Sequence, residues 1–135
     1  MKFYQQRPNG QRIRSMNKKV LVLEKDRDIL ELINIVLTDE GYIVNVLSSE
    51  LGIFDHIKNF QPDIILLDII SPTEEGTALC KTIKAAEDSS HIPVIVLSTH
   101  PKVEVVKEIC ADEVVAKPFD ISFLLSTIEQ QLITS

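Results

Sequence analysis

Four positions in this sequence place a polar or charged side chain directly after an apolar run. Glu24, Asp68, Ser98 and Lys117 each end a short segment built mostly from valine, isoleucine and leucine. Such runs are typical of buried strands in a parallel sheet. The carboxyl ends of parallel strands meet at one edge of the sheet, where open α/β folds bind their ligands. The sequence therefore predicts that two carboxylates, a hydroxyl and an ammonium group converge on one site.

The segments around these runs predict the elements that position the site. Residues 29–37 carry apolar side chains at the three-and-four spacing of an amphipathic helix. Gly41 supplies a stop for this helix, because glycine adopts the left-handed cap conformation without steric cost. Strand-like and helix-like segments alternate along the rest of the chain. We expect strands at residues 19–24, 42–47, 63–68, 93–98 and 113–117, and helices at 27–40, 50–60, 74–87, 102–110 and 120–133.

Five strand-then-helix units with short connections imply one parallel sheet with helices on both faces. The predicted fold class is therefore α/β, a three-layer sandwich around a flavodoxin-like five-stranded parallel sheet. A chain of 135 residues suits one domain. We expect residues 1–17, which are polar and contain no acid, to form a disordered basic tail. Residues 18–135 would form the folded domain.

Composition narrows the class of protein. The net charge is −6, but it is unevenly distributed. Residues 1–19 hold six basic side chains and no acid, so residues 20–135 contain eight basic and all 20 acidic side chains. Such an acidic body argues against direct nucleic-acid binding, which needs Lys and Arg at the phosphates. No apolar run approaches the roughly 20 residues of a membrane span. Cys80 and Cys110 fit neither a disulfide framework nor a metal spacing, so we expect two reduced cysteines in a cytoplasmic protein.

A series of short pieces follows in a fixed order along the chain: residues 20–24 and 62–68, Pro72, Gly76, and residues 93–98, 111–113 and 117–119. Through these pieces the chain resembles, over residues 19–133, the receiver domain of two-component response regulators. Any single matching piece is weak, whereas all of them in order, at family-like spacing, are very specific. The resemblance implies that residues 18–135 form a receiver domain, a signalling module rather than an enzyme.

The resemblance implies a role for each residue at the predicted edge. Asp68 would accept a phosphoryl group from the phosphohistidine of a histidine kinase or of a histidine phosphotransfer protein. Lys117 would hold one phosphoryl oxygen as a point charge, and Ser98 would donate a hydrogen bond to another. Pro118 would fix the Lys117 side chain through a peptide bond that is commonly cis in the family.

The Mg²⁺ site that the resemblance implies departs from the family pattern. Two acids normally follow the first strand and the second binds the metal directly, but here Lys25 follows Glu24. The implied ligands are Glu24, Asp68 and the backbone carbonyl of Ile70, with Asp26 as a further candidate. Two alternatives stay open. Either the Lys25 ammonium pairs with Asp68, lowers its pKa and supplies part of the metal's charge, or it points to solvent and Glu24, Asp26 and Asp68 share the metal.

Further departures concern the output of the domain. Val114 stands where the family usually has a tyrosine or phenylalanine whose rotation reports phosphorylation. Cys110 stands where a glycine usually ends the fourth helix, so it must avoid or tolerate a left-handed conformation. Ile70 and His100 occupy positions that tune phosphoryl lifetime in the family, and we expect His100 to face solvent.

Three functions fit these observations. The first is a stand-alone receiver that signals to a downstream protein through its fourth helix, fifth strand and fifth helix, with a homodimer through the last helices also possible. The second is a pseudo-receiver adaptor that binds partners without metal-dependent phosphorylation, as Lys25 and Val114 favour. The third is an enzyme or cofactor carrier on the same scaffold, which residues 24–27 disfavour because they form no glycine-rich phosphate loop.

Overall fold

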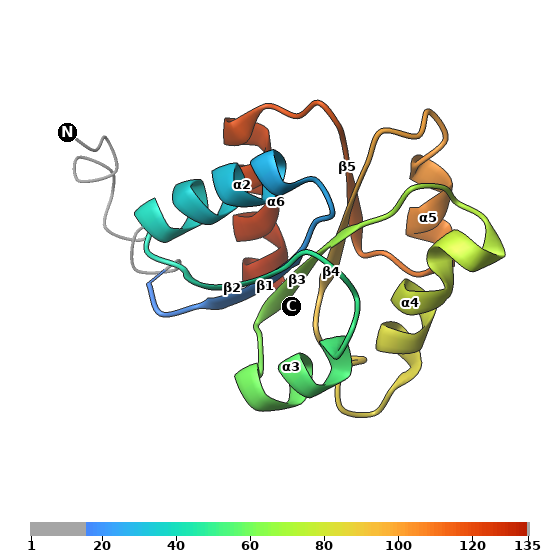
Figure 1. Cartoon of the computed structure of the whole chain (residues 1–135), viewed down its shortest axis with the longest axis horizontal. Helices are drawn as coiled ribbons and strands as arrows, with labels where there is room; N and C mark the ends of the chain where they lie inside the picture. The colour runs from blue at the N-terminus through green and yellow to red at the C-terminus, as the bar shows by residue number, and fades with distance from the viewer. Residues whose placement is uncertain (1–15, 135) are drawn as a thin grey trace.

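One parallel sheet of five strands, in the order β2-β1-β3-β4-β5, forms the centre of the protein (Figure 1). The structure is a computed structural model that describes residues 16–134, so residues 1–15 of the predicted tail lie outside the described residues. Every neighbouring pair of strands is parallel, which confirms the predicted sheet. The strands are β1 (Lys19–Leu23), β2 (Ile43–Leu47), β3 (Ile64–Asp68), β4 (Val94–Ser98) and β5 (Glu113–Ala116).

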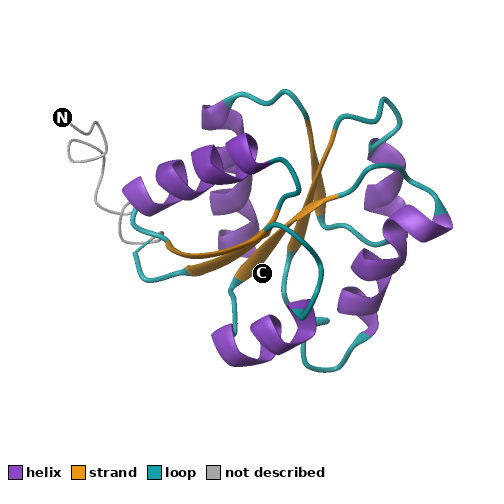
Figure 2. Ribbon diagram, in the orientation of Figure 1, coloured by secondary structure: helices purple, strands orange, loops and turns teal. Residues whose placement is uncertain are grey.

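Helices cover both faces of this sheet, as Figure 2 shows. Two of them, α2 and α6, lie on one face, and α3, α4 and α5 lie on the other (Figure 1). The predicted three-layer α/β sandwich is therefore confirmed. None of the helices within residues 16–134 is both long and apolar enough to cross a bilayer. The helices are α2 (Arg27–Asp39), α3 (Ile53–Phe60), α4 (Glu74–Ala85), α5 (Glu104–Ile109) and α6 (Ile121–Thr134).

The core is divided into two parts by the alternation of side chains along each strand. In β1, Val20 and Val22 pack toward α2 and α6, whereas Leu21 and Leu23 pack toward α3, α4 and α5. All four side chains are at most 1 % exposed. Burying an aliphatic side chain of this size stabilises the folded state by about 1.5–3 kcal/mol. The strands that carry the site are therefore held from both faces.

The ends of the helices follow local chemistry. Asp26 caps α2, because its Oδ1 accepts hydrogen bonds from the backbone N–H groups of Asp28 and Ile29 at 2.9 and 3.1 Å. Gly41 has φ 104°, which confirms it as the stop of this helix. The helix predicted from residue 50 begins instead at Ile53, since Gly52 precedes it in the left-handed region with φ 73°.

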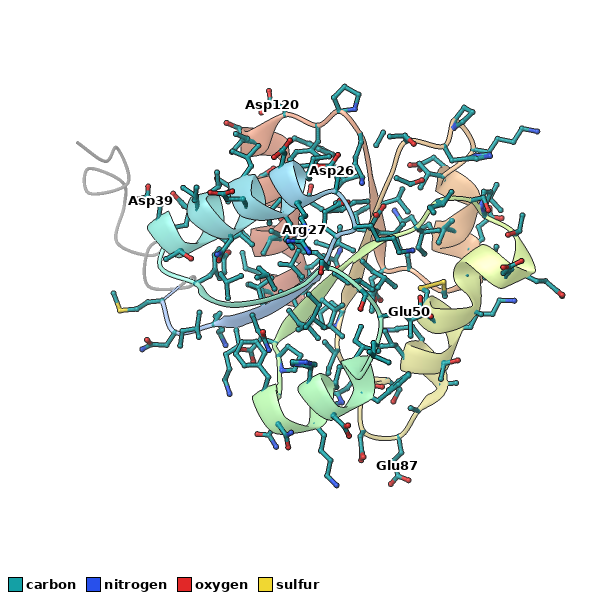
Figure 3. The ribbon with its side chains drawn as sticks, viewed as in Figure 1. Asp26, Arg27, Asp39, Glu50, Glu87 and Asp120 are labelled. Carbon is teal, nitrogen blue, oxygen red and sulfur yellow. A yellow bond between two sulfur atoms is a disulfide. The ribbon has the colours of Figure 1, made fainter. Side chains whose placement is uncertain are left out.

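The two cysteines correct one expectation. Cys80 of α4 and Cys110, which follows α5, form a disulfide, so the prediction of two reduced thiols is wrong for this structure (Figure 3). Their separation of 30 residues in the sequence gave no signal of pairing. Cys110 also avoids the left-handed conformation that a glycine would adopt there, because its φ is −156°.

Candidate functional site

The sheet brings the predicted residues to one edge. Asp68 and Ser98 are the last residues of β3 and β4, while Glu24 and Lys117 directly follow β1 and β5. The register aligns these strand ends, because Asp68 lies beside Leu97 in the neighbouring strand. The carboxyl ends of four adjacent strands thus place two carboxylates, a hydroxyl and an ammonium group close together.

Lys117 connects the two carboxylates. Its Nζ lies 2.7 Å from Glu24 Oε1 and 3.0 Å from Asp68 Oδ1. The three side chains are nearly buried, with exposed fractions of 8 % for Lys117, 0 % for Glu24 and 10 % for Asp68. The Lys117–Pro118 peptide bond is cis, the form that the resemblance implies. Two acids and one base at this burial leave the cluster one negative charge in excess when all three are ionised.

Burial and the hydrogen bonds within the Lys117 cluster shift the pKa of each of its three groups in opposite directions. Burial raises the pKa of Glu24, and this effect outweighs the hydrogen bond from Lys117 that favours the carboxylate. Burial also disfavours the charged form of Asp68, but hydrogen bonds from Lys117 and from the Glu24 carboxyl outweigh it and lower the Asp68 pKa. For Lys117, burial is outweighed by the two carboxylates, which raise the pKa of the ammonium. Asp68 is therefore the more readily ionised of the two acids.

Ser98 is buried beside this cluster, with 1 % of its surface exposed. Its Oγ accepts a hydrogen bond from the His100 backbone N–H at 3.1 Å, the only side-chain bond that the described residues give it. Its backbone carbonyl accepts from the Lys117 N–H at 2.8 Å, which ties β4 to the segment after β5. The His100 ring is half-buried, and its Nδ1 accepts from the Lys102 N–H at 3.0 Å.

The side chains of Lys25 and Asp26 form no hydrogen bond or ion pair with the Lys117 bridge within residues 16–134. The Lys25 side chain is exposed, and within residues 16–134 the ion pairs of Asp68 go to Lys117 alone. Only the backbone N–H of Lys25 reaches Asp68, at 3.3 Å from Oδ2. Asp26 lies at the start of α2, where it caps the helix (Figure 3). The Lys25 ammonium therefore forms no ion pair with Asp68 in this structure, and Asp26 is not brought to Asp68.

These residues do not fit the Mg²⁺ ion that the resemblance implies. Mg²⁺ requires near-octahedral oxygen ligands. Glu24 is fully buried, with Oε1 held by Lys117 and Oε2 accepting from the Asp26 backbone N–H at 3.0 Å. The residues that the structure describes contain no group of three or more Asp, Glu, His or Cys side chains able to hold a metal. Of the four implied ligands, Asp68 and Ile70 border the cavity described below, whereas Glu24 and Asp26 do not.

A cavity of about 430 Å³ lies next to Asp68, over the carboxyl edge of the sheet. The wall formed by the loop after β3 is close-packed, because a Cβ on Gly76 would lie 2.1 Å from the Ser71 carbonyl oxygen. Ile70, at the rim, is 68 % exposed. Two acids of this lining, Glu50 and Glu75, were not predicted from the sequence, although Glu50 follows β2 at the same edge. Polar residues in the lining are Lys25, Glu50, Asp68, Ser71, Thr73 and Glu75.

Val114 lies in β5, away from this cavity. It is 5 % exposed and belongs to the core on the α3, α4 and α5 face. It also borders a second cavity of about 470 Å³ that Glu104, Phe123 and Gln130 help to line. Valine brings no hydroxyl or ring to this surface, so the aromatic rotation described for the family has no counterpart here.

Curated proteins with similar sequences are bacterial regulators. The transcriptional regulatory protein CseB of Streptomyces coelicolor is 35 % identical over 116 residues, which cover 84 % of this chain and 48 % of that protein. The DNA-binding response regulator MtrA of Mycobacterium tuberculosis is 28 % identical over 121 residues, which cover 87 % of this chain and 52 % of that protein. The chain therefore spans about half the length of the curated relatives it matches.

Solved structures with the same fold include two receivers. A CheY-like response regulator receiver domain protein from Methanospirillum hungatei has a TM-score of 0.76 at 26 % identity, covering 87 % of this chain and 95 % of that one. The chemotaxis protein CheY4 of Vibrio cholerae has a TM-score of 0.74 at 22 % identity, and the match covers 84 % of this chain and 98 % of that one. A sequence model of the response regulator receiver domain matches residues 20–129. The chain belongs to the response regulator receiver domain family.

Proposed function

We propose that this receiver accepts a phosphoryl group on Asp68 from the phosphohistidine of a histidine kinase or a histidine phosphotransfer protein. One observation carries the proposal: a readily ionised carboxylate borders a cavity while a buried ammonium lies 3.0 Å from its other side. Phosphoryl transfer depends on positioning and charge stabilisation more than on covalent help from the protein. Receiver domains are signalling phosphoacceptors rather than classical enzymes, and family membership gives no support to the cofactor-carrier hypothesis.

The two oxygens of Asp68 have different surroundings. Within residues 16–134, Oδ1 is held by the Lys117 ammonium at 3.0 Å, whereas Oδ2 accepts a longer hydrogen bond from the Lys25 N–H at 3.3 Å. We assign Oδ2 as the nucleophile for this reason. Its attack forms a phosphorus–oxygen bond as the phosphorus–nitrogen bond of the phosphohistidine breaks, and the imidazole leaves with the electron pair of that bond. The lowered pKa of Asp68 keeps the carboxylate ionised for this step.

The neighbouring residues would stabilise the product. Lys117 already lies between Glu24 and Asp68 and would pair with a phosphoryl oxygen, which adds negative charge next to the ammonium. The Ser98 hydroxyl accepts from the His100 N–H but donates to no partner within residues 16–134, so its hydrogen can turn toward the phosphoryl group. Glu24 would position Lys117 rather than contact the phosphoryl group. No step requires Mg²⁺, since the donor groups do not fit it.

We infer that the output passes through protein contacts on α5, β5 and α6, in the cytoplasm. Val105, Ile109, Ile121 and Phe123 are apolar, lie on or beside these elements and are 38–53 % exposed. The acidic body of the chain supports a protein partner rather than direct nucleic-acid contact. The relative MtrA is described as DNA-binding and CseB as a transcriptional regulatory protein, but the chain spans only about half the length of either. A homodimer through the last helices stays a prediction.

The second candidate is a pseudo-receiver adaptor that binds partners without being phosphorylated. The position of Lys25 and the absence of a three-acid group among the described residues favour it. Under this hypothesis the site would serve as a fixed ion-pair cluster. The partner surface would then keep one conformation whatever the phosphoryl donor.

The two candidates are separated by phosphorylation with acetyl phosphate, followed by intact mass measurement. We expect wild type to gain one phosphoryl group, in the presence or absence of Mg²⁺, and Asp68→Asn to gain none. Lys25→Asp restores an acid at the family's metal position and should make the yield depend on Mg²⁺. No adduct on wild type together with an adduct on Lys25→Asp would select the adaptor. An equal adduct on Asp68→Asn would remove Asp68 from the mechanism.

A further inference from the structure

We propose that Cys80 and Cys110 are a reversible redox site that fixes α5 to α4. The two Sγ atoms are bonded, and the Cα atoms lie 5.9 Å apart, within the usual span of a disulfide. Both residues pack in the core on the same face of the sheet. Figure 3 shows the bond between the two helices. The inference does not depend on phosphorylation of Asp68.

The two sulfur atoms differ in access to solvent. Cys80 is fully buried, with 0 % of its surface exposed, whereas Cys110 is half-buried at the end of α5. A small external thiol or disulfide can therefore reach Cys110 first. Thiol–disulfide exchange proceeds by attack of a thiolate on a sulfur that it can reach. This asymmetry makes Cys110 the exchanging residue and Cys80 the resolving residue.

The reaction balances with a low-molecular-weight disulfide such as glutathione disulfide. The Cys110 thiolate attacks this disulfide, forms a mixed disulfide and releases one thiolate. The Cys80 thiolate then attacks the Cys110 Sγ and releases the second thiolate. The protein thiols lose two protons and two electrons, and the external disulfide is reduced to two thiols. Reduction by the free thiol follows the same steps in reverse.

The helix that the bond holds is weakly anchored by other means. α5 has six residues, and its N-cap residue, Val103, makes no side-chain capping bond. Val106 is its only buried residue, with Val103 buried just before it. Helices this short are marginal on their own and depend on tertiary contacts. Cutting the disulfide should therefore loosen α5 far more than the capped, 13-residue α2.

The position of α5 in the chain connects this redox site to the site at the sheet edge. The segment that contains α5 begins after Ser98 at the end of β4 and leads through β5 to Lys117. Cys80 lies in α4 next to Leu79, which lines the cavity beside Asp68. The redox state of the pair thus sets the mobility of the chain between two residues of the candidate site.

The test equilibrates the full chain in glutathione buffers of graded reduced-to-oxidised ratio. Alkylation and intact mass should show free cysteines giving way to an intramolecular disulfide within this series. The oxidised form should melt about 10 °C higher, and its α5 amides should exchange hydrogen about tenfold more slowly, with α2 unchanged. Cys110→Ser and Cys80→Ala should behave like the reduced protein at every ratio.

Four results would overturn the proposal. Alkylation of both cysteines at every ratio would exclude an intramolecular bond. Survival of the bond at every ratio would make it a permanent cross-link rather than a switch. Equal α5 exchange in the two redox forms, or a response to the ratio in Cys110→Ser, would show that the bond does not control this helix.

Discussion

Two lysine–carboxylate clusters lie at opposite edges of the sheet, and they use the same groups to different effect. The site cluster, Lys117 with Glu24 and Asp68, lies at the carboxyl edge with exposed fractions of 0–10 %. The structural cluster, Lys84 with Asp112, joins α4 to the turn before β5, with side chains 22 % and 36 % exposed. Its pair distance, 2.8 Å, is similar to those in the site cluster.

The two clusters differ in the balance of their charges and in their burial, rather than in the distance between lysine nitrogen and carboxylate oxygen. In the structural cluster one acid meets one base, and backbone groups satisfy both: Lys84 also donates to the Ile92 carbonyl, and Asp112 also accepts from the Val94 N–H. In the site cluster a second carboxylate competes for a single ammonium group, and all three side chains are nearly buried. Such competition shifts the pKa values of the groups and prepares one carboxylate for chemistry. A close ion pair alone is therefore no sign of a reactive site.

The largest effect is expected from Lys117→Met. This change leaves Glu24 and Asp68 buried without their cation, which should lower the free energy of unfolding by about 3 kcal/mol. Urea denaturation at neutral pH measures it. A loss below 1 kcal/mol would mean that the two carboxylates are neutralised or solvated without Lys117, and the contrast between the clusters would fail.

Lys84→Met is the matched change in the structural cluster. We expect a loss of about 1 kcal/mol, because the pair is partly exposed and Asp112 keeps its bond from the Val94 N–H. The phosphoryl adduct on Asp68 should be unaffected in the acetyl phosphate assay. A stability loss as large as that of Lys117→Met would show that the exposure of the pair does not decide its strength.

The pH dependence of stability should sharpen the contrast through Glu24→Gln. The folded-state pKa of Glu24 lies above 4.5, so its contribution is fully present below pH 4.5 and is lost as pH rises through the folded value. The lowered pKa of Asp68 acts in the opposite sense: its contribution is present above pH 3.8 and is lost as pH falls. In Glu24→Gln the free energy of unfolding should therefore decline less steeply as pH rises above 4.5. Its decrease at acidic pH, which comes from Asp68, should remain.

Thermal or urea unfolding across this pH range gives the comparison directly. Wild-type and Glu24→Gln curves that run parallel above pH 4.5 would show that Glu24 binds its proton no more tightly in the folded state. Asp68→Asn serves as the control, because it should remove the loss on the acid side.

The smallest change in stability is expected from Lys25→Asp. The side chain is exposed and makes no ion pair within residues 16–134, so the free energy of unfolding should stay within about 0.5 kcal/mol of wild type. Its effect should be on metal binding instead. Mg²⁺ should raise the melting temperature of Lys25→Asp but not of wild type or of Lys25→Met, which loses the charge without adding a ligand. A wild-type shift equal to that of Lys25→Asp would contradict the poor fit inferred for Mg²⁺.

Sequence patterns predicted the sheet and the meeting of its polar ends because both depend on regular periodicity. The end of α2 was predictable from Gly41, whereas the start of α3 was not, because Gly52 lies in the left-handed region and delays the helix to Ile53. Asp26 was ambiguous, since a carboxylate at that point can serve a metal or a helix end. Only the observed hydrogen bonds to Asp28 and Ile29 show which it serves here.

The disulfide illustrates the limit of such prediction. Whether two distant cysteines meet depends on how α4 and the end of α5 pack on the sheet, and no local pattern near Cys80 or Cys110 encodes that packing. The acids that line the cavity are an intermediate case. Glu50 follows a strand at the correct edge, but its loop had to be positioned before it could be assigned to the lining.

The close approach at Gly76 has a consequence for evolution of this chain. The Ser71 carbonyl oxygen packs against the backbone of α4 at Gly76, where even a methyl group would collide with it. Only glycine therefore fits at position 76, unless the turn that contains Ser71 changes at the same time. Sequence drift in the turn and drift in the helix are consequently coupled, and a descendant can reshape this wall of the cavity only by altering both together.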